Sequence, residues 1–300
     1  MPGLEKTALD RRALGRALSF VANVQASSMF KDLGEPSGTS AQRIGLTGAP
    51  GVGKSTLAGR LAMERLRGRR LGVLAIDPSS PKTGGAILGD RIRMDDLEGS
   101  ENLFIRSFGS RSAYDGLTDN LPELLDTMDQ FGFDEVIVET VGVGQVELAA
   151  RTHMDTLVLV IPPDAGDVVQ AMKAGITEIA DIFVVNKSDI ASSLKMATEI
   201  KRIVALTHPH GAVGWVPPVV LTSQARPESI VDLSVQVDRH IEWLQSSGEQ
   251  AARVLARRKY RLHRWFERRV RAIVDAESAA FFDLPPGQQV AGLLGKIPTR

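Results

Sequence analysis

The segment from Gly48 to Ser55 constrains this chain more than any other feature of its sequence. It follows an apolar run at 44–47 and precedes a helical pattern at 56–66 that opens with Thr56. Its residues are Gly48-Ala49-Pro50-Gly51-Val52-Gly53-Lys54-Ser55. Glycines at these positions let the backbone N–H groups face phosphate oxygens, the lysine brings a charge to the β- and γ-phosphates, and the serine hydroxyl reaches Mg²⁺. The segment therefore predicts a phosphate-binding loop, with Gly48 to Thr56 in contact with the nucleotide.

Short apolar runs recur through the middle of the chain and alternate with helical patterns. They lie at 44–47, 71–76, 103–105, 136–139, 156–161, 182–186 and 219–222. Runs of this kind are typical of parallel strands that are buried on both faces. We therefore expect an α/β P-loop NTPase fold, with a mostly parallel sheet covered by helices on both faces. Ligands of such sheets bind at the carboxyl ends of the strands, where the motifs of this chain fall.

Helical extensions are expected on either side of this central part. An amphipathic pattern at 7–30 is followed by a polar stretch at 34–40, which predicts a helix and then a linker. A long arginine-rich helical pattern with an apolar stripe covers 249–280. We predict an N-terminal helical extension at 1–38, a P-loop domain at 39–247 and a C-terminal helical arm at 248–300 that serves dimerisation.

Composition excludes several classes of protein. The 300 residues carry a formal net charge of zero, so the whole molecule does not steer toward nucleic acid or an acidic membrane. The absence of cysteine rules out a disulfide framework and thiolate metal ligands. No apolar run approaches the roughly 18 residues of a membrane span. Arg11, Arg12 and Arg16 suit a transit peptide, but Glu5 and Asp10 lie among them, so we expect a plain helix in a cytoplasmic protein.

Three carboxylates are placed to serve a magnesium ion beside the Ser55 hydroxyl. Asp77 ends one apolar run, Glu139 ends another, and Asp90 lies in a glycine-rich loop. Magnesium prefers oxygen ligands, and a carboxylate that closes an apolar strand is costly without a partner. Asp90 taken alone suits a turn equally well.

Asn186, which ends the run at 182–186, forms the pattern N-K-x-D with Lys187 and Asp189. The Asp189 carboxylate can accept hydrogen bonds from guanine N1–H and the exocyclic amine, whereas adenine would leave it unpaired. A site built around such bonds rejects the analogue that lacks them by factors of about 10⁴ or more. A segment after the next strand can supply the backbone N–H that closes over the guanine O6. Its residues are Ser223, Gln224 and Ala225.

The blocks at 75–85, 89–94 and 139–145 carry a more specific resemblance. They resemble the methylmalonyl-CoA-mutase-associated GTPases, the MeaB, ArgK and MMAA type of the G3E group. That group has Glu in place of Asp in its D-x-x-G switch, as in Glu139-x-x-Gly142. The likeness extends over about residues 8–225.

The resemblance implies roles for individual residues. Ser55, Asp77, Asp90 and Glu139 are expected in or beside the magnesium shell, Gly142 is expected to sense the γ-phosphate, and Arg93 is expected to belong to a mobile switch. Segment 164–170, with Lys173 just beyond it, resembles the additional switch through which these GTPases act on a client. Members of this family are usually homodimers that load adenosylcobalamin into an acyl-CoA mutase and protect it, with GTP as the gate.

Three positions depart from related patterns. Gln224 stands where the family commonly has Ala, and the tail after Ala280 is short and rich in Pro and Gly, which predicts a truncated or rearranged dimerisation arm. Val143 stands where Ras-like enzymes place a water-orienting Gln, so intrinsic hydrolysis is expected to be slow and partner-stimulated. Lys54, Arg93, Glu139 and Gly142 are the candidate catalytic residues, and the sequence leaves open whether Arg93 or Gln145 takes part in hydrolysis.

Other readings stay open at this point. A nickel- or zinc-delivery GTPase of the G3E group would need metal ligands, and the pair His208 and His210 is a weak candidate in a chain without cysteine. An ATP-dependent kinase is disfavoured by Asn186 and Asp189. The arginines of 253–271 suit a nucleic-acid surface, but a solvated or partner-facing arm with an apolar seam is the preferred reading. We thus expect GTP or GDP with Mg²⁺, a mutase client, a homodimer, and neither nucleic acid nor membrane as partner.

Overall fold

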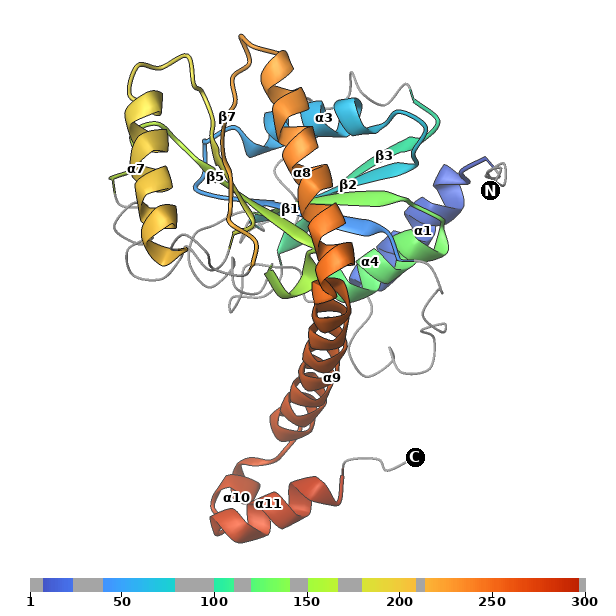
Figure 1. Ribbon diagram of the computed structural model, residues 1–300. Helices are drawn as coiled ribbons and strands as arrows, with labels where there is room; N and C mark the ends of the chain where they lie inside the picture. The colour runs from blue at the N-terminus through green and yellow to red at the C-terminus, as the bar shows by residue number, and fades with distance from the viewer. Residues whose placement is uncertain are drawn as a thin grey trace.

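The computed structural model describes residues 8–23, 40–78, 100–110, 120–140, 151–166, 180–208 and 214–296. These residues form a layered α/β body from which a helical arm extends (Figure 1).

A seven-stranded sheet with the order β3-β2-β4-β1-β5-β6-β7 forms the centre of the described part of the body, and its paired strands run parallel. The predicted fold class is therefore confirmed. The strands are β1 Gln42–Thr47, β2 Leu71–Pro78, β3 Leu103–Ser110, β4 Glu135–Thr140, β5 Thr156–Ile161, β6 Ile182–Val185 and β7 Val219–Leu221.

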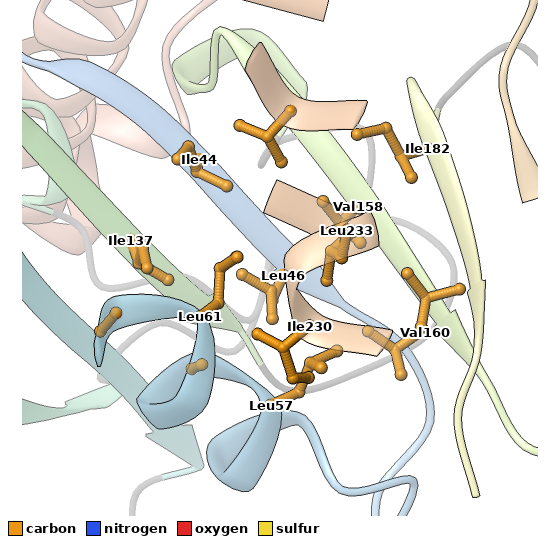
Figure 2. Packing of buried hydrophobic residues seen from close by; sticks show 14 of the residues in the cluster. Ile44, Leu46, Leu57, Leu61, Ile137, Val158, Val160, Ile182, Ile230 and Leu233 are labelled. Carbon is orange, nitrogen blue, oxygen red and sulfur yellow. The ribbon is translucent and has the colours of Figure 1, made fainter. Parts of the chain in front are cut away.

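One face of the sheet packs against α3 (Lys54–Arg65) and α8 (Glu228–Ser247). Because side chains alternate across a strand, every second residue contributes to this face. Figure 2 shows Ile44 and Leu46 of β1 beside Val158 and Val160 of β5, with Leu233 of α8 among them. These buried side chains fix the position of α3, and with it the position of the loop that precedes α3.

The intervening residues face the opposite side. In β4, Val136 and Val138 pack with α1 (Arg11–Asn23) and α4 (Leu121–Gln130), and in β6, Phe183 and Val185 pack with α7 (Ser193–Thr207). Leu14 and Leu18 of α1 are fully buried in this layer. The predicted amphipathic helix is thus present between residues 11 and 23, and it packs in the same hydrophobic cluster as α4 and β4.

Strand β3 is longer than the apolar run at 103–105 predicts. It continues through Arg106 and Ser107 because it lies at the edge of the sheet, where polar side chains are accommodated. Arg106 donates hydrogen bonds to the Gly15 carbonyl and the Ser19 hydroxyl of α1, both at 2.6 Å. Arg106, which interrupts the apolar pattern, therefore fastens the N-terminal helix to the edge of the sheet.

The C-terminal arm begins at Gly248, which separates α8 from α9 (Glu249–Asp275) with a left-handed φ of 81°. Helix α9 leads away from the body, and α10 (Ala279–Phe282) and α11 (Pro286–Leu294) lie at its far end (Figure 1). The continuous helix predicted at 249–280 therefore ends at residue 275. The Pro- and Gly-rich tail contributes the short helices α10 and α11, and Pro286 occupies the first turn of α11, where its missing N–H costs nothing.

Arginines on one side of α9 bond to the body of the molecule. Arg253 pairs with Asp181 at 2.9 Å and Arg257 with Asp155 at 2.9 Å, while Arg261 bonds to Asp126. Spacing by four residues places these side chains on one face of the helix. For these three arginines the reading as solvated or turned toward a partner is therefore corrected. Arg253 and Arg257 neutralise carboxylates that precede β6 and β5, and Arg261 neutralises a carboxylate of α4.

Most of the apolar stripe of α9 lies on the exposed part of its surface, and only Ile273 near its end is buried. Leu255, Leu262 and Phe266 each keep more than half of their surface exposed. Farther along the arm, Phe282, Val290 and Leu294 are also more than half exposed.

None of the helices within the described residues has the length and apolar character that a membrane span requires.

Candidate nucleotide site

The predicted phosphate loop leaves β1 and enters α3 with three glycines at positive φ, at positions 48, 51 and 53. A Cβ on Gly48 would lie 2.1 Å from the Val160 carbonyl oxygen, and one on Gly53 would lie 2.6 Å from Nδ2 of Asn186. Only glycine fits such left-handed, crowded backbone. The loop ends at the amino terminus of α3, where unpaired N–H groups and the helix dipole favour an anion.

Lys54 lies over the inside of this loop. Its Nζ donates to the carbonyl oxygens of Gly48 at 2.9 Å and Ala49 at 3.0 Å, and the residue is buried. Because the first turn of α3 holds the side chain, its ammonium group stays within the loop that would receive the phosphates. The position suits a cation for the β- and γ-phosphates.

Ser55 and Glu139 meet at the carboxyl edge of the sheet. The Ser55 hydroxyl donates to Oε1 of Glu139 at 2.7 Å, and Glu139 is buried at the end of β4, next to β1. A hydroxyl and a carboxylate in contact beside a phosphate loop are oxygen donors of the kind that Mg²⁺ binds, so the residues present fit this ion.

The other predicted members of the magnesium and switch regions are less completely described. Asp77 is near the end of β2, whose Ile76 pairs in register with Thr140 of β4, so its backbone lies one strand from Glu139. Asp90, Arg93 and Gly142 lie outside the described residues.

Asn186 and Lys187 fasten the base motif to the phosphate loop. Nδ2 of Asn186 donates to the Val52 carbonyl at 2.8 Å, and Nζ of Lys187 donates to the Gly51 carbonyl at 3.0 Å. The Thr222 hydroxyl donates to Oδ1 of Asn186 at 2.9 Å. Lys187 adopts a left-handed φ of 59°, uncommon for a side chain of this kind and typical of a functional turn.

Asp189 is oriented by Ser223, which follows β7. The Ser223 hydroxyl donates to Oδ1 of Asp189 at 2.6 Å and accepts from the Ala225 amide at 3.1 Å. The hydrogen bond from Ser223 lowers the pKa of Asp189 below its ordinary value, so the carboxylate stays charged. This is the form that accepts hydrogen bonds from N–H donors.

Two contacts near the base motif and the turn after β7 were not anticipated from the sequence. Nη1 of Arg60, on α3, donates to the Gln224 carbonyl at 3.1 Å, and Nη2 of Arg226 donates to the Ser188 hydroxyl at 2.6 Å. Arginines on helices and turns are so common that no local pattern distinguishes these two. Only the folded arrangement brings Arg60 to a residue 164 positions away.

The alternative metal pair receives no support where it can be examined. His208 follows the last residue of α7, with its Nδ1 3.0 Å from the Thr207 hydroxyl, and His210 lies outside the described residues. Within the part of the chain that the structure describes, no three His, Cys, Asp or Glu side chains gather as a metal site.

Comparison with known proteins agrees with this geometry. The family described as "Methylmalonyl Co-A mutase-associated GTPase MeaB" matches residues 14–279. The chain belongs to the MeaB family. The resemblance seen in the sequence is thereby confirmed, and the chain is a P-loop nucleotide hydrolase of the kind to which MeaB proteins belong.

Relatives of this MeaB protein occur in archaea, bacteria and animals. It is 42% identical over 243 residues to a Pyrococcus abyssi protein, covering 80% of this chain and 75% of the relative. It is 40% identical over 254 residues to a "Probable GTPase" of Mycobacterium tuberculosis, with 81% and 75% covered. The mouse "Methylmalonic aciduria type A homolog, mitochondrial" is 35% identical over 257 residues, with 83% and 60% covered.

Solved structures support the fold. The crystal structure of LAO/AO transport system kinase covers 96% of this MeaB chain and 93% of its own, with a TM-score of 0.63 and 24% identity. HypB from Helicobacter pylori in complex with nickel covers 75% and 95%, with a TM-score of 0.50 and 16% identity. Both likenesses concern the fold alone.

Proposed function

We propose that this chain hydrolyses GTP with Mg²⁺, and that it uses this reaction to gate adenosylcobalamin loading and protection of an acyl-CoA mutase such as methylmalonyl-CoA mutase. The observation that carries the choice of GTP is the bond from Ser223 to Asp189, which orients a charged carboxylate two residues after Lys187, whose ammonium group donates to the phosphate loop. A guanine ring offers that carboxylate two donors, whereas an adenine ring would leave it unpaired.

Hydrolysis transfers the γ-phosphoryl group of GTP to water and releases GDP and phosphate. Lys54 supplies positive charge where the phosphate oxygens gain negative charge, and the glycine-rich loop positions the phosphates. Ser55 and Glu139 would hold Mg²⁺, which neutralises phosphate charge when bound. Val143 has no side-chain group to orient water, so we expect slow intrinsic hydrolysis that a partner completes.

The family match and the name of the mouse relative support a mutase as the client. A structural contact adds to this support. The Ser192 hydroxyl donates to Oδ1 of Asp164 at 2.7 Å, which links the start of segment 164–170 to the turn after the base motif. Residues 167–170 and Lys173 lie outside the described residues. A client that contacts this segment would therefore act close to the nucleotide.

The oligomeric state and the location of the protein belong to the same proposal. The exposed apolar stripe of α9 suits a second copy of the chain, so we propose a homodimer through the 248–300 arm. The basic side of α9 is occupied by intramolecular ion pairs, which argues against nucleic acid as its partner. We also propose that the protein is cytoplasmic. In the proposed domain organisation, residues 1–38 form an N-terminal helical extension and residues 39–247 form the GTPase domain.

The nucleotide part of the proposal is tested by measuring phosphate release from GTP and ATP at equal concentrations with Mg²⁺, and by competing each against labelled GDP. We expect GTP and GDP to bind at least about 100-fold more tightly than ATP and ADP, which corresponds to about 2.7 kcal/mol. Equal affinity for the two bases would contradict GTP as the substrate and favour the kinase alternative.

A further inference from the structure

The turn that carries Ser223 is held from outside by two helices. Ser223 and Arg226 form an antiparallel bridge, with the Arg226 amide donating to the Ser223 carbonyl at 3.3 Å. This turn sets the direction of the Ser223 hydroxyl, which in turn orients Asp189. Residues that fix the position of this turn therefore also affect the orientation of the Asp189 carboxylate, which we propose binds the guanine base.

Ser229, in the first turn of α8, makes the inner of the two attachments. Its hydroxyl accepts from the Ser223 amide at 3.2 Å and donates to the Arg226 carbonyl at 2.5 Å. Both Ser223 and Ser229 are almost completely buried. One hydroxyl thus ties both ends of the turn to α8, and water cannot readily replace it.

Arg60, on α3, makes the outer attachment through its 3.1 Å bond to the Gln224 carbonyl. The bond is exposed, so its contribution is smaller than that of Ser229. It has a clear geometric role, because α3 also carries Lys54 and Ser55. The helix that presents the phosphate residues is connected directly to the turn on the base side.

We infer that Ser229 and Arg60 are positioning residues for base discrimination, acting on Asp189 through Ser223 and through the turn. Neither residue lies in the phosphate-loop or N-K-x-D pattern. The inference rests on the proposed function, since it assumes that Asp189 accepts hydrogen bonds from guanine. It adds that the precision of this recognition is set by α8 and α3.

The test compares the affinities of GDP and inosine diphosphate, which lacks only the 2-amino group of guanine. Both share the diphosphate and ribose, so their ratio reports the bond between that amine and Asp189. Isothermal titration with the full chain gives this ratio for the wild type, Ser229→Ala and Arg60→Ala. We expect the preference for GDP to fall about three- to tenfold in Ser229→Ala and about twofold to threefold in Arg60→Ala, with Arg60→Lys restoring most of it.

Ser234→Ala is the matched control for Ser229→Ala. Ser234 is also a buried serine of α8, but its hydroxyl accepts from Nη1 of Arg65 at 2.9 Å, away from the base turn. A loss of general stability would appear in both variants as a lower Tm. A positioning role predicts that only Ser229→Ala changes the ratio of the two affinities.

The possible results separate the inference from the function on which it rests. If the wild type fails to prefer GDP over ADP, the proposed function falls and the inference falls with it. If the wild type prefers GDP and the folded Ser229→Ala variant keeps the wild-type ratio, the inference alone is overturned. An equal loss in Ser234→Ala would also overturn it. Should Ser229→Ala fail to fold, Arg60→Ala decides, because it removes only an exposed hydrogen bond, and an unchanged ratio there rejects the inference.

Discussion

The Ser55 hydroxyl donates a 2.7 Å hydrogen bond to the carboxylate of Glu139, joining the first turn of α3 to the end of β4. These two residues are 84 positions apart in the sequence, and they meet because β1 and β4 are adjacent parallel strands. Their contact marks the place where we propose that Mg²⁺ is held.

Glu139→Gln should reduce the part of GTP affinity that depends on Mg²⁺. The amide keeps the size of the side chain but removes the charge that a divalent cation requires. We expect the ratio of GTP affinities in MgCl₂ and in EDTA to fall by about tenfold, or about 1.4 kcal/mol. Glu242→Gln, which removes an exposed carboxylate of α8, is the control and should leave the ratio unchanged. An unaltered ratio in Glu139→Gln would remove Glu139 from the magnesium site.

Lys54→Ala should abolish tight GTP binding. The substitution removes the buried ammonium group that lies over the phosphate loop, and no other side chain of that loop is cationic. The measurement is the Kd of GTP, with Lys195→Ala on the exposed side of α7 as the control. If Lys54→Ala bound GTP within about threefold of the wild type, roughly 0.7 kcal/mol, the assignment of the phosphate site would be wrong.

Asp189→Asn should shift preference from GTP toward xanthosine triphosphate. The amide can donate to the C2 carbonyl of xanthine, whereas it pairs poorly with the guanine amine. Competition between the two nucleotides on the wild type and the variant measures the shift. A variant that retained the guanine preference of the wild type would contradict the role of Asp189 in base recognition.

His153 should make the protein less stable in mild acid. It is buried beneath α9, and burial, together with nearby Arg43, Arg257, Arg264 and Arg268, lowers its pKa from 6.5 to about 3. The unfolded chain therefore binds a proton between these values while the folded chain does not, so the free energy of unfolding falls as the pH drops below 6.5. At pH 5 the loss from this group amounts to about 2 kcal/mol.

The His153→Phe variant isolates that contribution. The free energy of unfolding between pH 7 and pH 5 should decline by about 2 kcal/mol less in the variant than in the wild type. Its control is His263→Gln, which changes an exposed histidine of α9. Equal pH dependence in His153→Phe and the wild type would show that His153 titrates normally in the folded protein.

Much of the fold was predictable because parallel strands that are buried on both faces consist of short, continuous apolar runs in the sequence. All seven predicted runs correspond to strands, and the phosphate loop and base motif lie at the strand ends where they were expected. The edge strand β3 was predicted too short because Arg106 continues it with a polar side chain that bonds to α1. The polarity of neighbouring residues does not predict the length of an edge strand when its polar side chain bonds to a helix that is far away in the sequence.

The parts that were missed depend on contacts between distant segments. Arg253 and Arg257 of α9 were expected to be solvated because their partners, Asp181 and Asp155, precede strands that are far from the arm in the sequence. Ser229 and Arg60 are ordinary helix residues until the fold brings them to the turn at 223–226. The residues of the phosphate loop and the base motif could therefore be predicted from the sequence, whereas the side chains that position them could not.

The measurement that tests the account most directly is single-turnover GTP hydrolysis with and without an adenosylcobalamin-dependent acyl-CoA mutase from the same cell. The salt concentration is held constant, because ion pairs on the surface are screened by salt. We predict an acceleration of about tenfold or more, or about 1.4 kcal/mol of barrier, that weakens in Asp167→Ala and Lys173→Ala while basal hydrolysis stays nearly unchanged. If no such mutase binds the protein or accelerates its hydrolysis of GTP, the proposed role as a mutase chaperone is contradicted.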